Sequence, residues 1–182
     1  MSEASEVQAQ VVAAHIWPSD SPVPITTQSL DLDWGGAVGD RHFGLTMSSN
    51  ARQANTYPRS TIIRNHRQLS IVDESELAVI AVNLGLPELS PGVIADNLCT
   101  RGIPNLTQLP PMTRLVFDGG AVIMLGGENL PCVIAGGMVQ DRYGVRAEAF
   151  PKAAMGLRGV TGWVEHPGVI TPGQRIQIKS GT

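Results

Sequence analysis

Apolar and polar residues alternate over short stretches along most of this chain. Such alternation predicts β-strands. The stretches lie at 7–17, 29–32, 67–73, 114–117, 121–125, 162–164 and 175–178. Between them stand turn signals such as Asp118-Gly119-Gly120, and the chain holds 20 glycines and 13 prolines. Many short strands at close spacing are typical of a small barrel, so we expect a mostly β fold with a few helices, arranged as a barrel.

One segment has a clear helical pattern. Its apolar residues recur at helical spacing, at Leu77, Ile80, Ala81 and Leu84. Asp73 is placed to cap this helix, Glu76 would complete a capping box, and Gly85 would end it. A second, short helix is predicted to end at Gly156. The polar segment 45–61 carries few apolar residues and is predicted to be a long loop.

Length and composition limit the classes of function. With 182 residues, 42% of them apolar, and no internal repeat or linker, residues 1–182 are expected to form one domain. A net charge of −3 disfavours nucleic acid as a partner, and no apolar run is long enough to span a membrane. The polar N-terminal segment does not resemble a signal peptide. We therefore expect a cytoplasmic protein whose two cysteines are reduced.

Cys132 is the first candidate for chemistry. It follows Pro131 and is surrounded by glycines, which favours an exposed turn. Nearby cations would make such a thiol reactive, and Arg41, Arg67 or Arg158 could supply them. The alternative is a buried core cysteine, the commonest fate of a free thiol. Cys99 lies in a strand pattern and is expected to fill the core.

The turn from Gly39 to Gly44 is the second candidate. Glycine lets the backbone approach a ligand closely, Arg41 offers donors that suit phosphate or carboxylate, and His42 adds a further donor. Asp40 could hold Arg41 or cap backbone amides. The alternative is a surface turn with a solvated ion pair.

Three further residues complete the predicted site. Arg67 stands in the most basic stretch, although a charged strand edge would explain it equally well. Arg158 follows the short helix and could project its guanidinium into a site. Asn97 could tie loops together through backbone amides, which would be a structural role.

Other chemistries lack their sequence signals. No histidine pair has close metal-ligand spacing and no CxxC is present, so a structural zinc site is not expected. The chain has no GxSxG, Walker or GxGxxG motif. Lysine occurs only at 152 and 179, and neither position suggests a Schiff base with pyridoxal phosphate.

Taken in order, several segments resemble the MOSC family, which is named for the C-terminal domain of molybdenum cofactor sulfurases. They are GDRHFG (39–44), NHRQLSIVDESEL (65–77), PGVIADNL (91–98), LPPMTRLVF (109–117), ENLPC (128–132) and LRGVTGWVEHPGVITPGQRIQI (157–178). The motif-bearing part is about 36–178, and the length resembles the stand-alone bacterial form. The resemblance implies a barrel like the small domain of pyruvate kinase and a site for the molybdenum cofactor.

The resemblance also assigns residues. The family's cysteine falls on Cys132, its glycine-acid-arginine turn on 39–41, and its acidic-Asn-Leu motif on 96–98, with Asp96 where Glu is more usual. In full-length sulfurases pyridoxal phosphate belongs to a separate desulfurase domain, so it is not expected in this chain.

The resemblance leaves two roles open for Cys132. As a molybdenum ligand, it would belong to a protein that reduces N-hydroxylated substrates with electrons from a partner protein. As a persulfide carrier, it would exchange sulfur with a donor or acceptor protein. A rival hypothesis is a non-catalytic barrel that binds a small anion or a protein. A second rival is a scaffold in which Cys132 is buried.

Overall fold

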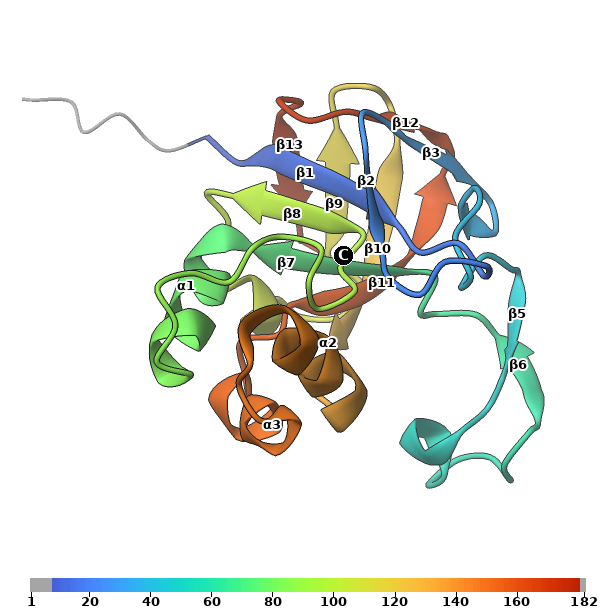
Figure 1. The fold of residues 1–182 in the computed structure, drawn as a ribbon. Coiled ribbons are helices and arrows are strands. Elements are labelled where there is room, and N and C mark those ends of the chain that lie inside the picture. The colour runs from blue at the N-terminus through green and yellow to red at the C-terminus, as the bar shows by residue number, and fades with distance from the viewer. Residues whose placement is uncertain (1–7, 181–182) are drawn as a thin grey trace, which may run out of the picture.

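A computed structural model of the chain describes residues 8–180 (Figure 1). Its main sheet has eight strands in the order β13-β9-β10-β11-β7-β8-β1-β2. Their bounds are β1 Gln10–Ile16, β2 Ile25–Thr27, β7 Leu69–Asp73, β8 Leu98–Arg101, β9 Arg114–Phe117, β10 Val122–Glu128, β11 Val160–His166 and β13 Ile176–Lys179. All neighbours pair antiparallel except β7 and β8. The strands predicted from alternation are therefore present, although residue 7 lies outside the described residues.

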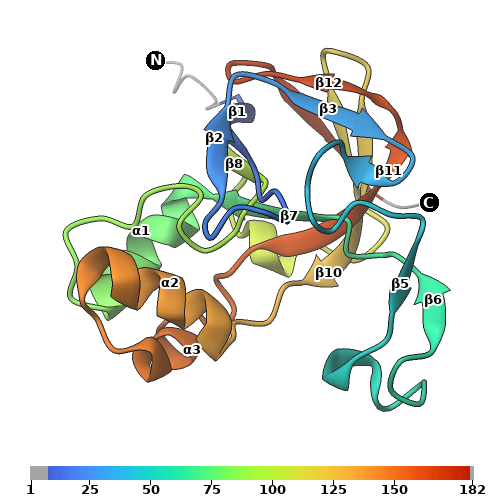
Figure 2. The same ribbon diagram turned by 45° about the vertical axis from the view of Figure 1, so that its right-hand side comes forward.

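Two smaller sheets and several helices complete the fold. One sheet joins β12 (Gly168–Ile170), β3 (Leu30–Asp33) and β4 (Gly36–Ala37), and the other joins β5 (Thr46–Ser48) and β6 (Ile62–Arg64). The helices are α1 Glu74–Asn83, α2 Val133–Tyr143 and α3 Phe150–Ala153, with short 3-10 helices at η1 Ala51–Gln53, η2 Leu106–Gln108 and η3 Ala147–Ala149. Figure 2 shows the three α-helices grouped on one side and the β5–β6 arm on another. Among residues 8–180, none of the helices combines the length and apolar composition needed to cross a bilayer.

The expected closed barrel is not formed. The main sheet begins at β13 and ends at β2, and no ladder of paired strands joins these edges. Backbone hydrogen bonds of 2.8–2.9 Å do connect the start of β1 to residues 173–176. The contact includes one isolated antiparallel bridge, between Gln10 and Arg175, and it ends at a turn formed by Gly173 and by Pro172, which has no N–H to donate. The mostly β class was predicted correctly, and its closure was not.

Two apolar clusters pack against opposite faces of β7 and β8. Ile71 and Leu98 belong to the cluster enclosed by the sheets, whereas Val72 and Cys99 belong to the cluster beneath the helices. This division follows from the two-residue period of a strand, in which neighbouring side chains point to opposite faces. Cys99 is buried, as its pattern predicted. The helices thus form a second layer on the sheet.

Helix α1 follows its prediction except at one residue. Asp73 caps it by accepting a hydrogen bond of 3.1 Å from the Ser75 amide. Glu76 does not complete a capping box, because its buried carboxylate accepts bonds from the amide and hydroxyl of Thr107. Burial raises the pKa of Glu76, although the bonds from Thr107 act in the opposite direction.

Helix α2 was not predicted, and it changes the setting of Cys132. Its sequence contains Gly136 and Gly137, and glycine weakens a helix. A Cβ at Gly136 would lie only 2.2 Å from the carbonyl oxygen of Ala147, so glycine is needed for close packing against η3. Cys132 is the N-cap of this helix and is half-buried, so the expected exposed turn was wrong.

The segment 45–61 is also more ordered in its structure than a long loop. It contains β5 and the 3-10 helix η1, and β6 follows it directly. Asn50 and Gln53 form a capping box at η1, with side-chain bonds of 3.0 Å to the backbone. The few apolar residues of the segment favoured a loop, whereas its order comes from this local pattern of polar side chains.

Candidate functional site

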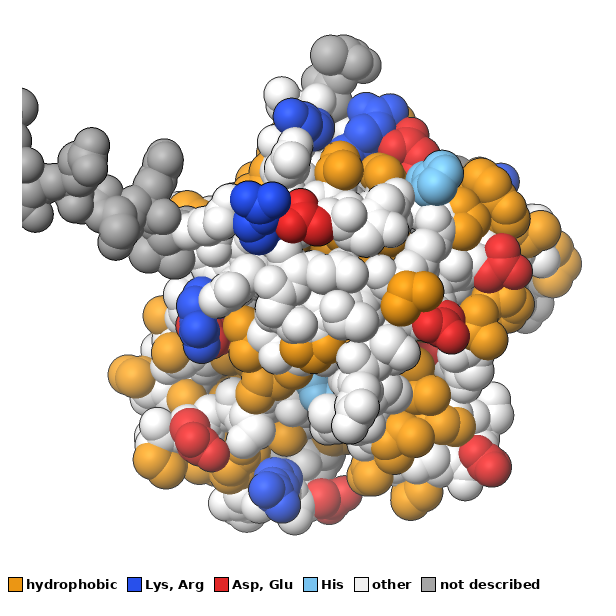
Figure 3. Space-filling view, turned by 90° about the horizontal axis from the view of Figure 1, so that it is seen from above, with side chains coloured by type: hydrophobic (Ala, Val, Ile, Leu, Met, Phe, Trp, Pro, Cys, Tyr) orange, Lys and Arg blue, Asp and Glu red, His pale blue; other side chains and the backbone are white. Residues whose placement is uncertain are grey.

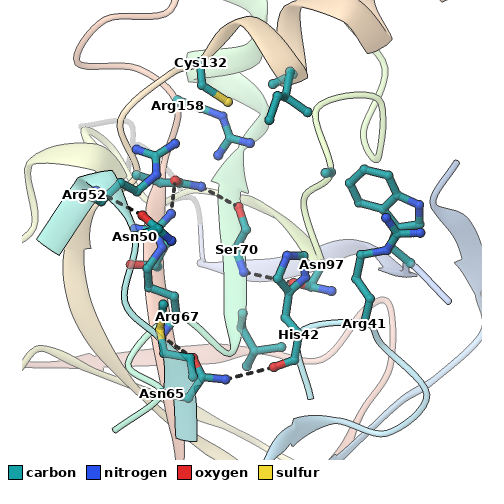
Figure 4. A pocket seen from close by; sticks show the side chains of 18 of the residues that line it. Arg41, His42, Asn50, Arg52, Asn65, Arg67, Ser70, Asn97, Cys132 and Arg158 are labelled. Carbon is teal, nitrogen blue, oxygen red and sulfur yellow. Dashed lines mark hydrogen bonds between the residues drawn. The ribbon is translucent and has the colours of Figure 1, made fainter. Parts of the chain in front are cut away.

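A pocket of about 520 Å³ lies between the 39–44 turn, the β5–β6 arm and the start of α2. Residues of β7, of β11 and of the segment between β10 and α2 contribute to its lining, most of which Figure 4 shows. The lining residues are Trp17, Arg41, His42, Phe43, Thr46, Met47, Asn50, Arg52, Asn65, Arg67, Leu69, Ser70, Ala95, Asn97, Asn129, Cys132, Ile134, Ala135, Met138, Arg158 and Thr161. The predicted residues Cys132, Arg41, His42, Arg67, Asn97 and Arg158 all contribute, whereas Gly39 and Asp40 do not.

Cys132 presents its thiol at the start of a helix. Its backbone is extended and its side chain makes no capping hydrogen bond. In Figure 4 its sulfur points toward the guanidinium of Arg158. The first amides of an α-helix have no partners within the helix, and the helix dipole favours negative charge at this end. The position therefore suits a thiolate or an anion bound beside it.

Arg158 is buried without full hydrogen bonding. Its Nη2 donates to the carbonyl oxygen of Ile94 at 2.7 Å, while Nε and Nη1 have no partner among the described residues. Burial lowers the pKa of this guanidinium, Cys132 acts in the opposite direction, and Arg52 lowers it further. Gly159 fixes the position of Arg158, because it has φ +78° and a Cβ there would lie 1.9 Å from the Ile71 carbonyl oxygen. Buried polar groups normally have hydrogen-bond partners. Nε and Nη1 of Arg158 are therefore available to donate to an acceptor that the described residues do not supply.

Arg67 lies next to Arg158 and is held by amide side chains. Its Nη2 donates to Oδ1 of Asn129 at 2.9 Å, and Nδ2 of Asn129 donates to Oγ of Ser70 at 3.0 Å. Its backbone amide donates to Oδ1 of Asn65. Burial lowers the pKa of Arg67 to about 10, and the charges of Arg52 and Arg158 contribute in the same direction. Arg67 has no carboxylate partner in the described residues.

The 39–44 turn is stabilised by Asp40. Its buried carboxylate accepts hydrogen bonds of 2.7–2.9 Å from the amides of Trp17 and His42 and from Nδ2 of Asn97, and it lies 2.9 Å from Nδ1 of His42. Burial alone would raise the pKa of Asp40, but the bonds from His42 and Trp17 outweigh it and hold the pKa below its usual value. Gly39 has φ +87°, which allows the turn. These two residues support the pocket from behind.

Arg41 lines the pocket, but it is exposed and one of its nitrogens is bonded to the preceding loop. Its Nη2 donates to the carbonyl oxygens of Pro18 and Ser21 at 3.0 and 2.9 Å. The guanidinium also lies over the Trp17 ring, 3.8 Å from its centroid. His42 has a half-exposed ring at the pocket. The predicted arginine turn is therefore present, although Arg41 mainly anchors the loop before it.

Asn97 is fully occupied by structural hydrogen bonds. Its Oδ1 accepts from the Ser70 amide at 3.0 Å, and Nδ2 donates to the His15 carbonyl oxygen and to Asp40. Asp96 beside it is buried away from the pocket, where the Gly92 amide bonds both carboxylate oxygens. Burial raises the pKa of Asp96, although His15 opposes this. The acidic-Asn pair shapes the loop that carries the Ile94 carbonyl.

Several lining residues were not singled out from the sequence. Asn129 stands three residues before Cys132 in ENLPC, and its place in that motif was the available signal. Arg52 reaches the pocket from the arm and donates to the Leu130 carbonyl oxygen at 3.3 Å. Ser70 offered no signal beyond its polar place in a strand. These residues link the arm and β10 to Arg67.

The charge of the pocket differs from that of the rest of the surface. Four arginines line it, and none of its lining residues is Asp or Glu. Elsewhere, basic side chains lie beside acidic ones, as in Figure 3, and ion pairs join Arg101 to Glu74 and Arg114 to Glu165. The whole chain carries −3. Within residues 8–180, no three His, Cys, Asp or Glu side chains cluster as metal ligands do. The pocket therefore combines several positive charges with a thiol.

Known proteins share this sequence and fold. The MOSC domain matches residues 39–177. YuaD of Bacillus subtilis (strain 168), named as a candidate metal-sulfur cluster biosynthesis protein, is 38% identical over 173 residues, or 92% of this chain and 90% of YuaD. The crystal structure of YuaD has a TM-score of 0.90 at 36% identity and covers 96% of this chain and 97% of that one.

More distant structures share only the fold. YiiM from Geobacillus stearothermophilus has a TM-score of 0.60 at 15% identity, covering 94% of this chain and 75% of its own. YiiM from Escherichia coli has a TM-score of 0.55 at 13% identity, covering 95% and 71%. The sequence match over most of the chain, together with the 38% identity to YuaD, confirms the resemblance noted in the sequence. The chain belongs to the MOSC domain family.

Proposed function

We propose that the pocket binds the molybdenum cofactor, with Cys132 as its protein ligand. One observation carries this proposal: buried Arg158 has two donor nitrogens, Nε and Nη1, without partners, beside a thiol, in a pocket lined by no carboxylate. A buried cation in that state is costly unless an anion accepts its bonds.

The residues fit the chemistry of this cofactor. The cofactor, a pterin dithiolene with a phosphate tail, is the group that membership of the MOSC domain family implies. Guanidinium groups such as those of Arg158 and Arg67 bind phosphate and pterin oxygens, and a thiolate is a suitable ligand for a metal that favours sulfur. When bound, the cofactor would supply two-electron redox chemistry, and the family resemblance suggests reduction of N-hydroxylated substrates with electrons from a partner protein.

The chain's own residues prepare the site. Arg158 and Arg67 hold anionic groups, while Asn129 and Ser70 keep Arg67 oriented. The N-terminus of α2 stabilises negative charge at Cys132. Asp40, outside the pocket, fixes the turn that forms the opposite wall.

Cofactor content tests the proposal. Protein purified from a molybdate-replete host is analysed for molybdenum by mass spectrometry and for pterin by fluorescence after oxidation. The full-length wild type and Cys99→Ala should carry both, while Cys132→Ser should lose molybdenum. Neither metal nor pterin in the wild type would overturn the proposal and favour the non-catalytic anion-binding module.

A second candidate is a persulfide carrier at the same thiol. The half-buried Cys132 at a helix N-terminus favours it, because a persulfide anion gains the same stabilisation as a thiolate. YuaD carries a name that refers to metal-sulfur cluster biosynthesis, and sulfur transfer with a donor or acceptor protein is compatible with that name. Intact-protein mass spectrometry would show one added sulfur atom on Cys132 and none on Cys132→Ser.

A further inference from the structure

We infer that Cys132 takes sulfur directly from a small inorganic sulfur anion, of which thiosulfate is the simplest. This inference deepens the persulfide role and rests on the proposed function only in placing Cys132 at the reacting position. It names the class of donor: a sulfane sulfur attached to an anionic sulfonate group. The donor is recognised by charge and by hydrogen bonds, and no partner protein is required for loading.

Recognition of the sulfonate end is supplied by buried Arg158 and half-buried Arg67. Arg158 leaves Nε and Nη1 without acceptors, and it is only 6% exposed. Arg67 lies close enough to Arg158 and Cys132 for all three charges to interact. A sulfonate offers three oxygens, so it can accept from both guanidinium groups at once. No carboxylate lines the pocket, and the acidic side chain that acts on Arg158, Asp96, is buried outside the lining.

The thiol is placed to receive the sulfur. Cys132 is the N-cap of an 11-residue helix and makes no capping bond, so its sulfur is free to react. In Figure 4 it points toward Arg158, where the sulfonate would bind. The first-turn amides and the helix dipole stabilise negative charge on the thiolate before transfer and on the persulfide after it.

The transfer is balanced without an external oxidant. The Cys132 thiol first loses its proton to water. Its thiolate then attacks the outer sulfur of thiosulfate, a Cys132 S–S bond forms, and the S–S bond of thiosulfate breaks. Sulfite leaves with the bonding electron pair, so cysteine is oxidised to the persulfide level as the donor is reduced to sulfite. A nucleophile such as cyanide removes the outer sulfur as thiocyanate and restores the thiolate.

The test uses full-length protein from a molybdate-free culture, with thiosulfate as the probe. Sulfite release, thiocyanate formation with cyanide, and one added sulfur on the peptide that contains Cys132 are measured. We expect all three in the wild type and in Cys99→Ala, and none in Cys132→Ser. Arg158→Met and Arg67→Met should each react roughly tenfold to a hundredfold more slowly at low thiosulfate, because a hydrogen bond to a charged group is lost.

Two controls separate recognition from general damage. In Arg158→Met, alkylation of Cys132 by neutral iodoacetamide should be slowed, relative to the wild type, much less than the thiosulfate reaction is. Arg175→Met, which removes an exposed arginine paired with Asp118, should leave both rates unchanged. Arg158→Lys keeps the charge and should retain part of the thiosulfate rate, which provides a second variant if Arg158→Met does not fold.

The outcomes distinguish this inference from the proposed function. No added sulfur on wild-type Cys132, or equal slowing of thiosulfate and iodoacetamide in Arg158→Met and Arg67→Met, would overturn it. If the same protein from a molybdate-replete host then carries molybdenum and pterin, the cofactor proposal stands while the sulfur donor is wrong.

Discussion

Arg41 and Arg158 both border the pocket, yet their surroundings give them different roles. Arg41 donates to two carbonyl oxygens of its own preceding loop and lies over Trp17. Arg158 makes one bond to a carbonyl and leaves two buried donor nitrogens without partners. The 39–44 turn is therefore a scaffold whose arginine is exposed and bonded to the preceding loop, whereas the wall formed by Arg158, Arg67 and Cys132 contains buried donors without partners.

The difference shows that residue type alone does not identify a binding group. From the sequence, both arginines were candidates for binding an anion, and each stands near a glycine. What separates them is burial: both bond only through Nη2, but Arg41 is exposed to solvent, whereas Nε and Nη1 of Arg158 are buried without partners. Variants that remove one group at a time test this contrast between scaffold and binding wall.

The largest expected effect is on anion binding in Arg158→Met. Loss of the two free donors should weaken sulfate binding by about 1.5–3 kcal/mol, the range for hydrogen bonds to charged groups. The apolar side chain removes a buried charge that lacks full hydrogen bonding but also removes the bond to the Ile94 carbonyl, so the free energy of unfolding should change little. Titration calorimetry and urea denaturation measure the two quantities. A variant that is much less stable yet binds sulfate as well as the wild type would reverse the roles of the two regions.

Asp40→Asn should affect stability instead. Four donors converge on this carboxylate, so the free energy of unfolding should fall by about 1–3 kcal/mol, with a smaller change in sulfate affinity per folded molecule. Since the folded-state pKa of Asp40 is lowered, this stabilisation is present above the unfolded pKa and is lost as pH falls through the folded pKa. Urea denaturation of both proteins should therefore show a difference at pH 7 that shrinks in acid. A constant difference would contradict the assignment.

Arg67 gives a smaller effect that depends on pH. Because its pKa is lowered to about 10, its charge disappears as pH rises through that value, and sulfate affinity should decline there. The measurement is a sulfate titration from pH 8 to about 11. Burial lowers the pKa of Arg158 as well, so the profile of Cys132→Ser, which lacks the thiolate, is compared with that of Cys132→Ser carrying Arg67→Met. Both proteins keep Arg158, and the second should show a smaller decline. A flat profile with Arg67 present would indicate that it does not contact the anion.

Arg41→Met should have the smallest effect on sulfate affinity. Its guanidinium already bonds Pro18 and Ser21, so sulfate affinity should fall by less than about 1 kcal/mol, the scale of an ordinary net hydrogen bond. The loss of packing on Trp17 should lower stability by a similar amount. If Arg41→Met loses as much affinity as Arg158→Met, the distinction between the two arginines fails.

The sequence predicted some of these features for identifiable physical reasons. Helix α1 was predictable because Asp73 and the apolar spacing act locally. Helix α2 was not, since Gly136 is required by packing against Ala147, a contact between separate segments. The order of the family motifs brought Cys132 and the arginines into one hypothesis, and they do border one pocket.

Other features depend on contacts that sequence spacing does not encode. The hydrogen bonds of the Arg41 side chain go to the carbonyl oxygens of Pro18 and Ser21, about twenty residues earlier. Arg52 enters the pocket only because the β5–β6 arm folds toward Leu130. The barrel was expected from strand spacing and from the family resemblance, whereas its closure depends on how far the pairing of β1 with the residues before β13 extends beyond the single bridge of Gln10 with Arg175.

The most direct test is alkylation of the two cysteines in the folded protein, resolved by peptide, with and without sulfate. Cys99 is buried, and burial together with Asp96 and Asp73 raises the pKa of its thiol. We expect iodoacetamide to label Cys132 before Cys99. Saturating sulfate should slow the labelling of Cys132, and Arg158→Met should remove this effect of sulfate. Faster labelling of Cys99, or labelling of Cys132 that sulfate does not change, would contradict the claim that this wall binds an anion beside a reactive thiol.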